Sequence, residues 1–194
     1  MNAPLSLDAN SWSGVPVAVT GAGGFIGSHL AEALVAAGAD VRGLVSYRSQ
    51  PEVGALRWAD PQVAAAIEVH RGDVRDVEAM ERLVAGRDVV FHLAALAGIP
   101  FSYTDPRTVL DVNLTGTLNL ALASRDAGVG RFVQTSTSEV YGTAQRVPIT
   151  EEHPISAQSP YAASKAAADQ LVLSFHRSYD LPVTVVRPFN TYGP

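Results

Sequence analysis

The sequence predicts an α/β fold, a Rossmann-like doubly wound parallel sheet with helices on both faces. Short apolar runs alternate along the 194 residues with segments of helical periodicity. A glycine-rich stretch, TGAGGFIG, follows the first apolar run and opens the first helical one. Because strands that alternate with helices form right-handed βαβ units, the sheet is expected to be parallel.

The elements follow from these patterns one by one. The run VPVAVTG is apolar along its length, which is typical of a buried strand. The helical segments carry apolar residues at helical spacing. In chain order we expect strand 15–21, helix 25–39, strand 40–46, strand 66–73, helix 76–86, strand 87–95, helix 108–128, strand 131–138, helix 161–179 and strand 182–188.

The sequence indicates one domain. Residues 1–13 are expected to be an N-terminal extension, and residues 14–194 a dinucleotide-binding Rossmann domain. The segment 47–65 has the least regular pattern and is expected to be an irregular excursion on the surface.

Composition excludes several classes of protein. Hydrophobic residues make up 47% of the chain and charged residues 17%, which is typical of a globular domain. A net charge of −5 gives no nucleic-acid surface. Cysteine is absent and the five histidines are scattered, so no metal site is expected. With no signal peptide and no apolar run of membrane length, we expect a cytoplasmic protein without a membrane partner.

The glycine-rich loop is the first candidate site. Gly21, Gly24 and Gly27 stand between a predicted strand and a predicted helix, the context that a dinucleotide-binding loop requires. Glycines let the backbone approach a pyrophosphate, which then lies on the helix N-terminus. We expect these glycines, with Phe25 and Ile26, to bind the cofactor; the alternative is a plain tight turn.

The end of the second strand leaves NAD and NADP both open. Dinucleotide sites usually carry an acid there for the ribose 2′-hydroxyl. Here Val45 or Ser46 occupies that place, and Arg48 lies just beyond. Arg48 is able to meet a 2′-phosphate; otherwise it is a solvated loop arginine.

Further cofactor contacts are expected where the other strands end. Asp73 is placed to hold the adenine amino group or to cap the next helix. The small residues of HLAAL allow the backbone near the cofactor, and Asn113, in an apolar helix, needs a buried partner or a solvent face. The residues expected at these contacts are Ser46, Arg48, Asp73, Val74, Leu93, Ala94, Ala95 and Asn113.

The segment SPYAASK contains Lys165, the one lysine among 14 lysine and arginine residues. Tyr161 precedes it by four residues, so both side chains share one helix face. We expect the ammonium to lower the tyrosine pKa and to bond a cofactor ribose, so that Tyr161 takes a proton from a substrate hydroxyl. Thr137, Ser138 and Glu139 cluster at the end of the fifth strand, where ligands collect in such sheets.

Five motifs together resemble the extended short-chain dehydrogenase/reductase enzymes that act on nucleotide sugars, the NAD(P)-dependent epimerase/dehydratase family. They are TGAGGFIGSHL, FHLAA, STSEVYG, SPYAASK and RPFNTYGP, and the resemblance covers residues 14–194. It implies that Tyr161, Lys165 and Thr137 are catalytic and that NAD⁺ or NADP⁺ is the cofactor. It also implies that Thr137 and Asn190 touch the substrate.

The motif STSEVYG indicates the reaction. Glucose-type 4,6-dehydratases have an Asp-Glu pair after the threonine, whereas here Ser138 takes the Asp position and Glu139 is kept. The wider context is most similar to the nucleotide N-acetylhexosamine or GDP-sugar 4,6-dehydratases of legionaminic acid type. The resemblance therefore implies a 4,6-dehydratase in which Glu139 removes the C5 hydrogen. The alternatives are a UDP-glucuronate decarboxylase, a 4-epimerase, or a non-catalytic dinucleotide-binding protein.

The resemblance also implies features beyond the site. Family members continue into a C-terminal substrate lobe, which we expect to be absent from this chain. The expected substrate is a GDP-, UDP- or dTDP-hexose. The helices at 108–128 and 161–179 are expected to pair in a homodimer.

Overall fold

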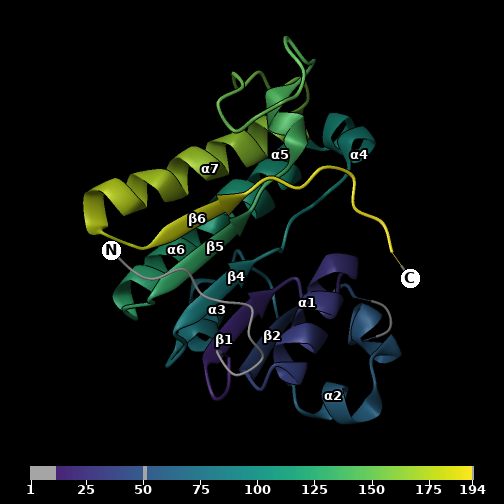
Figure 1. Cartoon of the computed structure of the whole chain (residues 1–194), viewed down its shortest axis with the longest axis vertical. Helices are drawn as coiled ribbons and strands as arrows, with labels where there is room; N and C mark the ends of the chain where they lie inside the picture. Colours follow the sequence, from purple (N-terminus) through teal and green to yellow (C-terminus); the bar gives the residue numbers. More distant parts are fainter. Residues whose placement is uncertain (1–11, 50–51, 194) are drawn as a thin grey trace.

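The computed structural model describes residues 12–49 and 52–193, and it contains the predicted six-stranded parallel sheet (Figure 1). The strand order is β3-β2-β1-β4-β5-β6. The chain first adds β2 and β3 on one side of β1 and then adds β4, β5 and β6 on the other side, so the order of strands reverses between β1 and β4. In such sheets ligands bind at the carboxyl ends of the strands beside this reversal. The strands are β1 (Pro16–Thr20), β2 (Asp40–Ser46), β3 (Glu68–Gly72), β4 (Val89–His92), β5 (Arg131–Thr135) and β6 (Val183–Val186).

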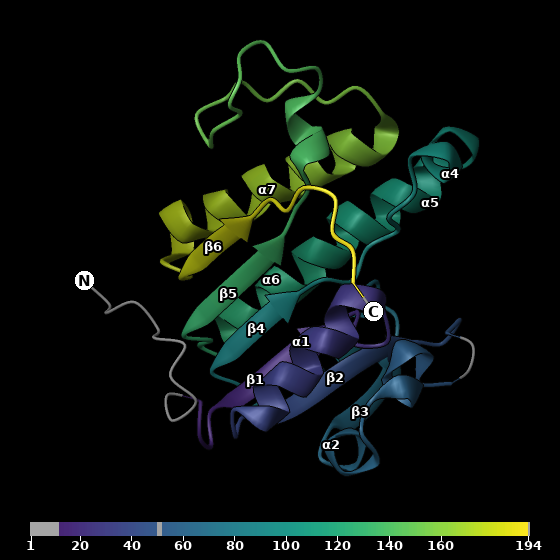
Figure 2. The ribbon, with the colours of Figure 1, turned by 45° about the vertical axis from the view of Figure 1, so that its right-hand side comes forward.

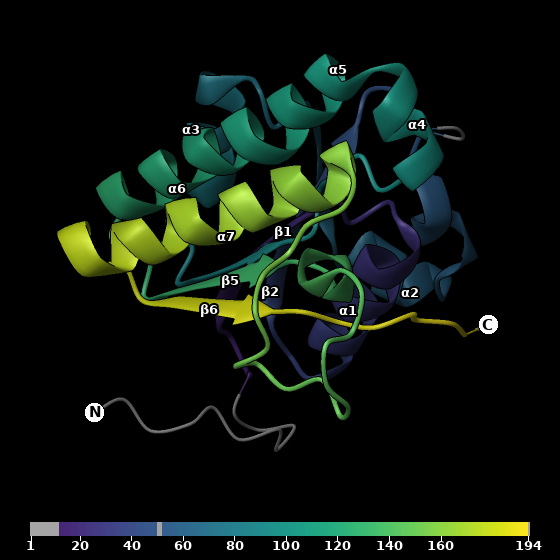
Figure 3. The same cartoon turned by 90° about the horizontal axis from the view of Figure 1, so that it is seen from above.

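Helices cover the sheet in two layers. On one face α3 (Val77–Val84), α6 (Gly116–Asp126) and α7 (Pro160–Tyr179) enclose a core that includes Phe132 and Leu120 (Figure 3). On the other face α1 (Phe25–Ala36) packs over β1 and β2. The doubly wound fold class predicted from the sequence is confirmed.

The face of β5 and β6 on the α1 side has no helix over it in the described part of the chain (Figure 2). In β6 the side chains on that side, Thr184 and Val186, are exposed, and Val186 is 45% accessible. The sheet is therefore enclosed on both faces only around β1, β2 and β4.

The predicted helix 108–128 is wrong as a single regular helix. The chain forms α5 (Pro106–Leu110), a π-helical turn (Asp111–Thr115) and then α6. A π-turn adds one residue to the helical repeat and so changes which side chains point inward. It places Asn113 in the interior, at 0% exposure.

The segment 47–65 is more ordered than predicted. It contains a 3₁₀ turn (Gly54–Trp58) and the short helix α2 (Pro61–Ala65), which Asp60 caps by accepting a hydrogen bond from the Gln62 amide. Leu56 is buried in the α1-side core. Residues 50–51 lie outside the described residues.

Two short elements were missed by the sequence predictions, and the predicted N-terminal extension is described only in part. The short helix α4 (Ile99–Thr104) and a 3₁₀ turn (Ser138–Tyr141) were not expected. Most of the predicted extension, residues 1–11, lies outside the described residues. Trp12, also within it, is buried against Phe91 with ring centroids 6.1 Å apart. No helix among the described residues has the length and apolar character to cross a membrane.

Candidate active site

Two cavities lie at the carboxyl edge of the sheet and share Gly21, Gly24, Leu93 and Ala95. The first has a volume of about 280 Å³ and the second about 390 Å³. Together they form a trough from the end of β3, across the β1–α1 loop, to the start of α7. Its two compartments, joined at a glycine loop, fit the two halves of a dinucleotide.

The glycine loop is held by backbone packing. A Cβ on Gly27 would lie 2.1 Å from the Gly21 carbonyl oxygen, so only glycine lets α1 begin this close to β1. Gly21 has a φ of +72°, and a Cβ there would lie 2.8 Å from the Ala94 nitrogen. The loop therefore presents its backbone to the trough, as the sequence predicted.

The first cavity contains most of the residues predicted at the adenosine end. Predicted residues that line it are Gly21, Gly24, Ser46, Arg48, Asp73, Val74, Leu93, Ala94 and Ala95. Residues that were not predicted are Gly23, Ser49, Gly72, Arg75, Leu96 and Val112. Arg75 follows Asp73 by two residues, and that spacing was the available signal for it.

Asp73 is paired within the cavity wall. Its carboxylate accepts two side-chain hydrogen bonds from Arg75, at 2.9 and 2.6 Å. These bonds, with a smaller contribution from the charge of Arg48, lower the pKa of Asp73 below its usual value. Asp76 caps α3, so the alternative that Asp73 is the helix cap is wrong. The first cavity thus combines one carboxylate with two guanidinium groups.

The second cavity brings together groups from five parts of the chain. Predicted residues that line it are Gly21, Gly24, Phe25, Ile26, Gly27, Leu93, Ala95, Thr137, Tyr161, Lys165 and Asn190. Residues that were not predicted are Ala97, Thr135, Ser136, Pro188, Phe189 and Thr191. Ser159 caps α7 and Pro160 occupies its first turn, which sets Tyr161 and Lys165 at the cavity.

Tyr161 differs from the sequence prediction in its protonation. Burial raises its pKa, a hydrogen bond with Thr137 lowers it, and the Glu139 carboxylate raises it again. The expected lowering by Lys165 is wrong for this structure, because desolvation of the phenolate outweighs the other effects. Thr137 is the contact that favours the phenolate.

Lys165 is buried, with 2% of its surface exposed, yet it lines the second cavity. Burial lowers its pKa to about 8, and the nearby Asp169 opposes this by raising it. The ammonium is thus held in a poorly solvated place beside the trough.

Ser138 and Glu139 lie behind Thr137 in the 3₁₀ turn and do not line either cavity. Glu139 is exposed, and its amide donates to the Thr137 hydroxyl at 3.2 Å. Its carboxylate is close enough to act on the pKa of Tyr161. The structure places Glu139 at the margin of the trough.

Asn113 stands behind the cavity wall. Its side-chain oxygen accepts from the Leu96 amide at 2.8 Å, and its nitrogen donates to the Ser164 hydroxyl at 2.9 Å. It therefore ties the segment after β4 to α7, beside Lys165. The polar residue has the buried partners that the sequence required.

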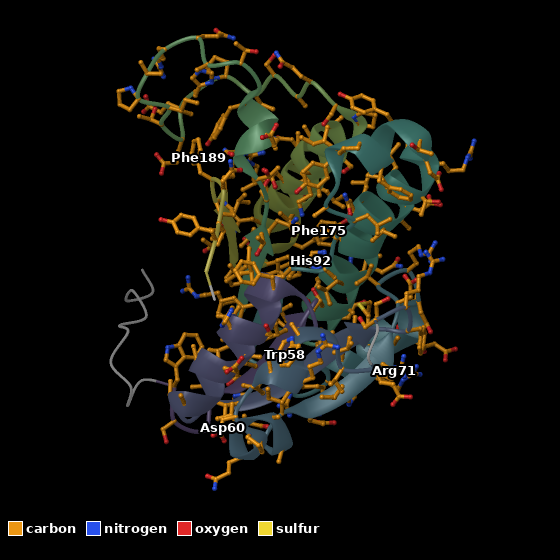
Figure 4. The ribbon with its side chains drawn as sticks, turned by 90° about the vertical axis from the view of Figure 1, so that its right-hand side faces the viewer. Trp58, Asp60, Arg71, His92, Phe175 and Phe189 are labelled. Atoms are coloured by element: carbon orange, nitrogen blue, oxygen red, sulfur yellow. The ribbon has the colours of Figure 1, made fainter. Side chains whose placement is uncertain are left out.

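A second buried network supports the same wall. His92, in the interior (Figure 4), bonds Thr20 through Nδ1 at 2.7 Å and Thr117 through Nε2 at 2.9 Å. Burial lowers its pKa to about 3, so the imidazole is neutral. Since Thr117 donates to the Asn113 carbonyl at 2.6 Å, the ends of β1 and β4 are fixed to the π-turn.

Comparisons with known proteins agree with this geometry. The family described as GDP-mannose 4,6 dehydratase matches residues 18–194. A dTDP-glucose 4,6-dehydratase of Streptomyces griseus is 40% identical over 183 residues, which are 91% of this chain and 54% of the relative. The chain thus spans about half the length of this curated relative.

Solved structures of a 4-epimerase and of a 4,6-dehydratase are both similar to this chain. A UDP-N-acetylglucosamine 4-epimerase from Methanobrevibacter ruminantium has a TM-score of 0.85 and 32% identity, covering 94% of this chain and 57% of that one. A dTDP-glucose 4,6-dehydratase from Streptomyces venezuelae with NAD bound has a TM-score of 0.82 and 37% identity, covering 92% and 56%.

Proposed function

The chain belongs to the GDP-mannose 4,6 dehydratase family, and from this premise we propose that it carries the cofactor-binding and oxidising half of a nucleotide-sugar 4,6-dehydratase. The observation that supports this most directly is the second cavity. It joins Thr137, Tyr161 and Lys165 to the glycine loop in one space. The proposed substrate is a nucleoside-diphosphate hexose.

The trough fits a nicotinamide dinucleotide, with its pyrophosphate at the start of α1 and its adenosine beside Asp73. The cofactor supplies one chemistry, a hydride acceptor for C4 that later returns the hydride to C6. The chain's own residues bind it: the glycine loop by its backbone and Lys165 by its ammonium. Whether the cofactor is NAD or NADP depends on Arg48.

Proton transfer at C4 is assigned to Tyr161. In its phenolate form, the side chain would take the proton of the C4 hydroxyl while that carbon gives up its hydride. Thr137 hydrogen-bonds the phenol and lowers its pKa, which favours the basic form. Lys165 on the same helix face holds positive charge beside the developing phenolate.

Elimination of water is assigned to Glu139. Oxidation at C4 acidifies the C5 hydrogen, and the Glu139 carboxylate takes it as a proton. The C6–O bond then breaks, and the departing hydroxide takes that proton from Glu139 and leaves as water. Ser138 stands where glucose-type 4,6-dehydratases have an acid. The marginal position of Glu139 requires that the sugar reach across Tyr161 toward the 3₁₀ turn.

A panel experiment tests the reaction class. A longer protein, in which this chain is joined to a substrate lobe like that of family members, is incubated with the cofactor and with UDP-, GDP- and dTDP-hexoses and a UDP-hexuronate. The products are measured by mass spectrometry. A product lighter by one water supports the dehydratase, and loss of carbon dioxide from a UDP-hexuronate would instead indicate a decarboxylase. Dinucleotide binding with no product from any sugar would favour a non-catalytic binding protein.

A second candidate is a 4-epimerase, because Glu139 lies outside the cavity whereas Thr137, Tyr161 and Lys165 line it. Epimerisation needs oxidation and reduction at C4 alone, so the product mass does not change. The new stereochemistry at C4 is then read from the proton coupling constants of the sugar.

Glu139→Gln separates the two candidates. The exchange keeps the side-chain shape but removes the base, and loss of one positioned base slows a reaction about 10²–10⁴-fold. A dehydratase variant should accumulate reduced cofactor and a 4-keto sugar that retains its C6 oxygen, without taking solvent deuterium into C5. Unchanged water loss and deuterium uptake would remove Glu139 from the mechanism.

The proposed assembly is a homodimer through α5–α6 and α7, which lie side by side as an outer layer (Figure 3). Leu110 is 41% exposed, and Leu114, Leu118 and Leu122 are partly buried at four-residue spacing along this layer. Such an apolar row fits a second copy of the same helices. The covered leucines would contribute about 25 cal/mol for each Å² removed from water.

A further inference from the structure

A carboxylate lies buried beneath the second cavity, on a residue that the proposed reaction does not use. Asp169 has 0% exposure and stands on α7. Its Oδ2 accepts from the Ser136 hydroxyl at 2.8 Å and from Arg187 Nε at 3.0 Å. Arg187 also donates to the Tyr141 hydroxyl at 3.1 Å, so the ion pair is held by the residue after β5, by the 3₁₀ turn and by the residue after β6.

The other carboxylate oxygen of Asp169, Oδ1, is not hydrogen-bonded to any residue that the structure describes. Asp169 Oδ1 is buried and has no hydrogen-bond partner among the described residues. An unpartnered buried oxygen of an ionised carboxylate is costly, because its charge is neither solvated nor bonded. The arrangement therefore leaves negative potential directed into the interior beside α7.

Lys165 is the cation that the negative charge of Asp169 attracts. It precedes Asp169 by four residues on α7, which sets the two side chains on one helix face. Both are buried, so their mutual attraction is weakly screened. Asp169 is the neighbouring charge that acts on Lys165 and favours its charged form.

The other titratable groups around this pair do not stabilise the Lys165 ammonium. His92, packed from β4, is neutral, and Tyr161 is an uncharged phenol with a raised pKa. Arg187 carries a positive charge, which opposes an ammonium nearby. Glu139 is exposed and acts on Tyr161. Burial raises the pKa of Asp169 itself, and the bonds from Ser136 and Arg187 counteract that rise.

We infer that Asp169 is a positioning residue whose carboxylate, clamped by Ser136 and Arg187, keeps Lys165 in its ammonium form at the cofactor trough. The inference deepens the proposed function and rests on it for its biological meaning. It explains why a charged cluster is buried under the cavity. Lys165 is then charged before a dinucleotide ribose arrives and can donate to its hydroxyls at once.

The test uses the fact that Lys165 is the sole lysine in the sequence. Protein labelled with ¹³C at the lysine ε-carbon gives one lysine signal, which reports the titration of Lys165 without assignment. The wild-type midpoint is expected near pH 8. In Asp169→Asn it should fall by about one pH unit or more, the scale of losing an adjacent opposite charge.

The matched control is Asp40→Asn. Asp40 is also ion-paired with an arginine, Arg87 at 2.7 Å, but it lies at the start of β2, at the opposite edge of the sheet. Its exchange should leave the midpoint unchanged. A midpoint in folded Asp169→Asn equal to that of wild type would overturn the inference.

A double variant covers the case in which Asp169→Asn does not fold. Asp169→Leu with Arg187→Met removes both members of the buried pair and leaves no unpaired charge, a replacement that proteins often tolerate. In this variant the loss of the Arg187 charge favours an ammonium nearby, so a fall in the Lys165 midpoint is assigned to the loss of Asp169. An unchanged or higher midpoint contradicts the role of Asp169. The titration needs no substrate, so an inactive protein would count against the proposed function alone.

Discussion

At the scale of single residues, Lys165 carries a positive charge in a place that disfavours it. Its pKa lies well below the ordinary 10.5 because the side chain is buried. A residue kept under such conditions is typical of a functional site, where stability and activity oppose each other.

Lys165→Met should therefore stabilise the fold at neutral pH. Folded Lys165 has a pKa of about 8 and unfolded lysine about 10.5, which corresponds to on the order of 3 kcal/mol of destabilisation below pH 8. Between pH 8 and 10.5 the unfolded state binds more protons, so wild-type stability rises with pH. Denaturant titrations should show the advantage of the variant shrinking through that window. An advantage independent of pH would show that Lys165 is not the titrating group.

Arg48→Ala tests the choice of cofactor. If the guanidinium meets a 2′-phosphate, its loss should weaken NADP binding by about 1–3 kcal/mol and leave NAD nearly unchanged. Calorimetric titration of both cofactors measures this. Arg82→Ala is the control, since Arg82 lies in the last turn of α3, at the opposite edge of the sheet. Equal losses for both cofactors would mean that Arg48 does not discriminate.

Residue types and spacings in the sequence predict which side chains meet, but not their environments. The i, i+4 relation of Tyr161 and Lys165 and the position of Thr137 at a strand end place all three at one cavity. The direction of the Tyr161 pKa could not be predicted, because desolvation depends on what covers the phenol. Nor could the sequence show that the side-chain amide of Asn113 is hydrogen-bonded to Leu96 and Ser164.

At the scale of elements, the start of α1 depends on the absence of side chains in the glycine loop. Gly27 is buried against the Gly21 carbonyl, a backbone group that cannot rotate away. The helix therefore approaches the strand more closely than any larger residue allows.

Gly27→Ala should destabilise the protein by about 1–3 kcal/mol through overpacking, although alanine favours helices by about 1 kcal/mol. It should also abolish dinucleotide binding, because the loop must move. Gly98→Ala is the matched control, since its Cβ would meet only the Phe101 side chain at an ordinary 3.6 Å. Thermal melting and cofactor titration measure the two effects. A variant as stable as wild type with normal affinity would contradict the close approach.

Periodicity predicted the six strands and the helices α1, α3 and α7 well, because most of these elements bury apolar side chains. It missed the π-turn, since one extra residue alters the helical phase without any change in composition. It also missed the short turns of 47–65, where Asp60 before Pro61 was a usable start signal.

At the scale of the whole molecule, the proposed dimer gives a direct test. Leu110→Glu puts a charge into the outer layer of α5–α6 and should shift sedimentation from dimer toward monomer. Val77→Glu is the control, because Val77 is exposed to a similar extent, 52%, but lies on α3. A wild-type protein that sediments as a monomer at all concentrations would refute the dimer.

The outermost strands β3 and β6 bear on how the molecule avoids aggregation. An edge strand offers unpaired backbone groups to any other extended chain. β6 has only four residues, lies between Pro182 and Pro188, and is followed at once by Arg187. β3 has five residues, among them Glu68 and Arg71. Short length, flanking prolines and charge let the valine-rich centre of the sheet form without offering a template for fibril growth.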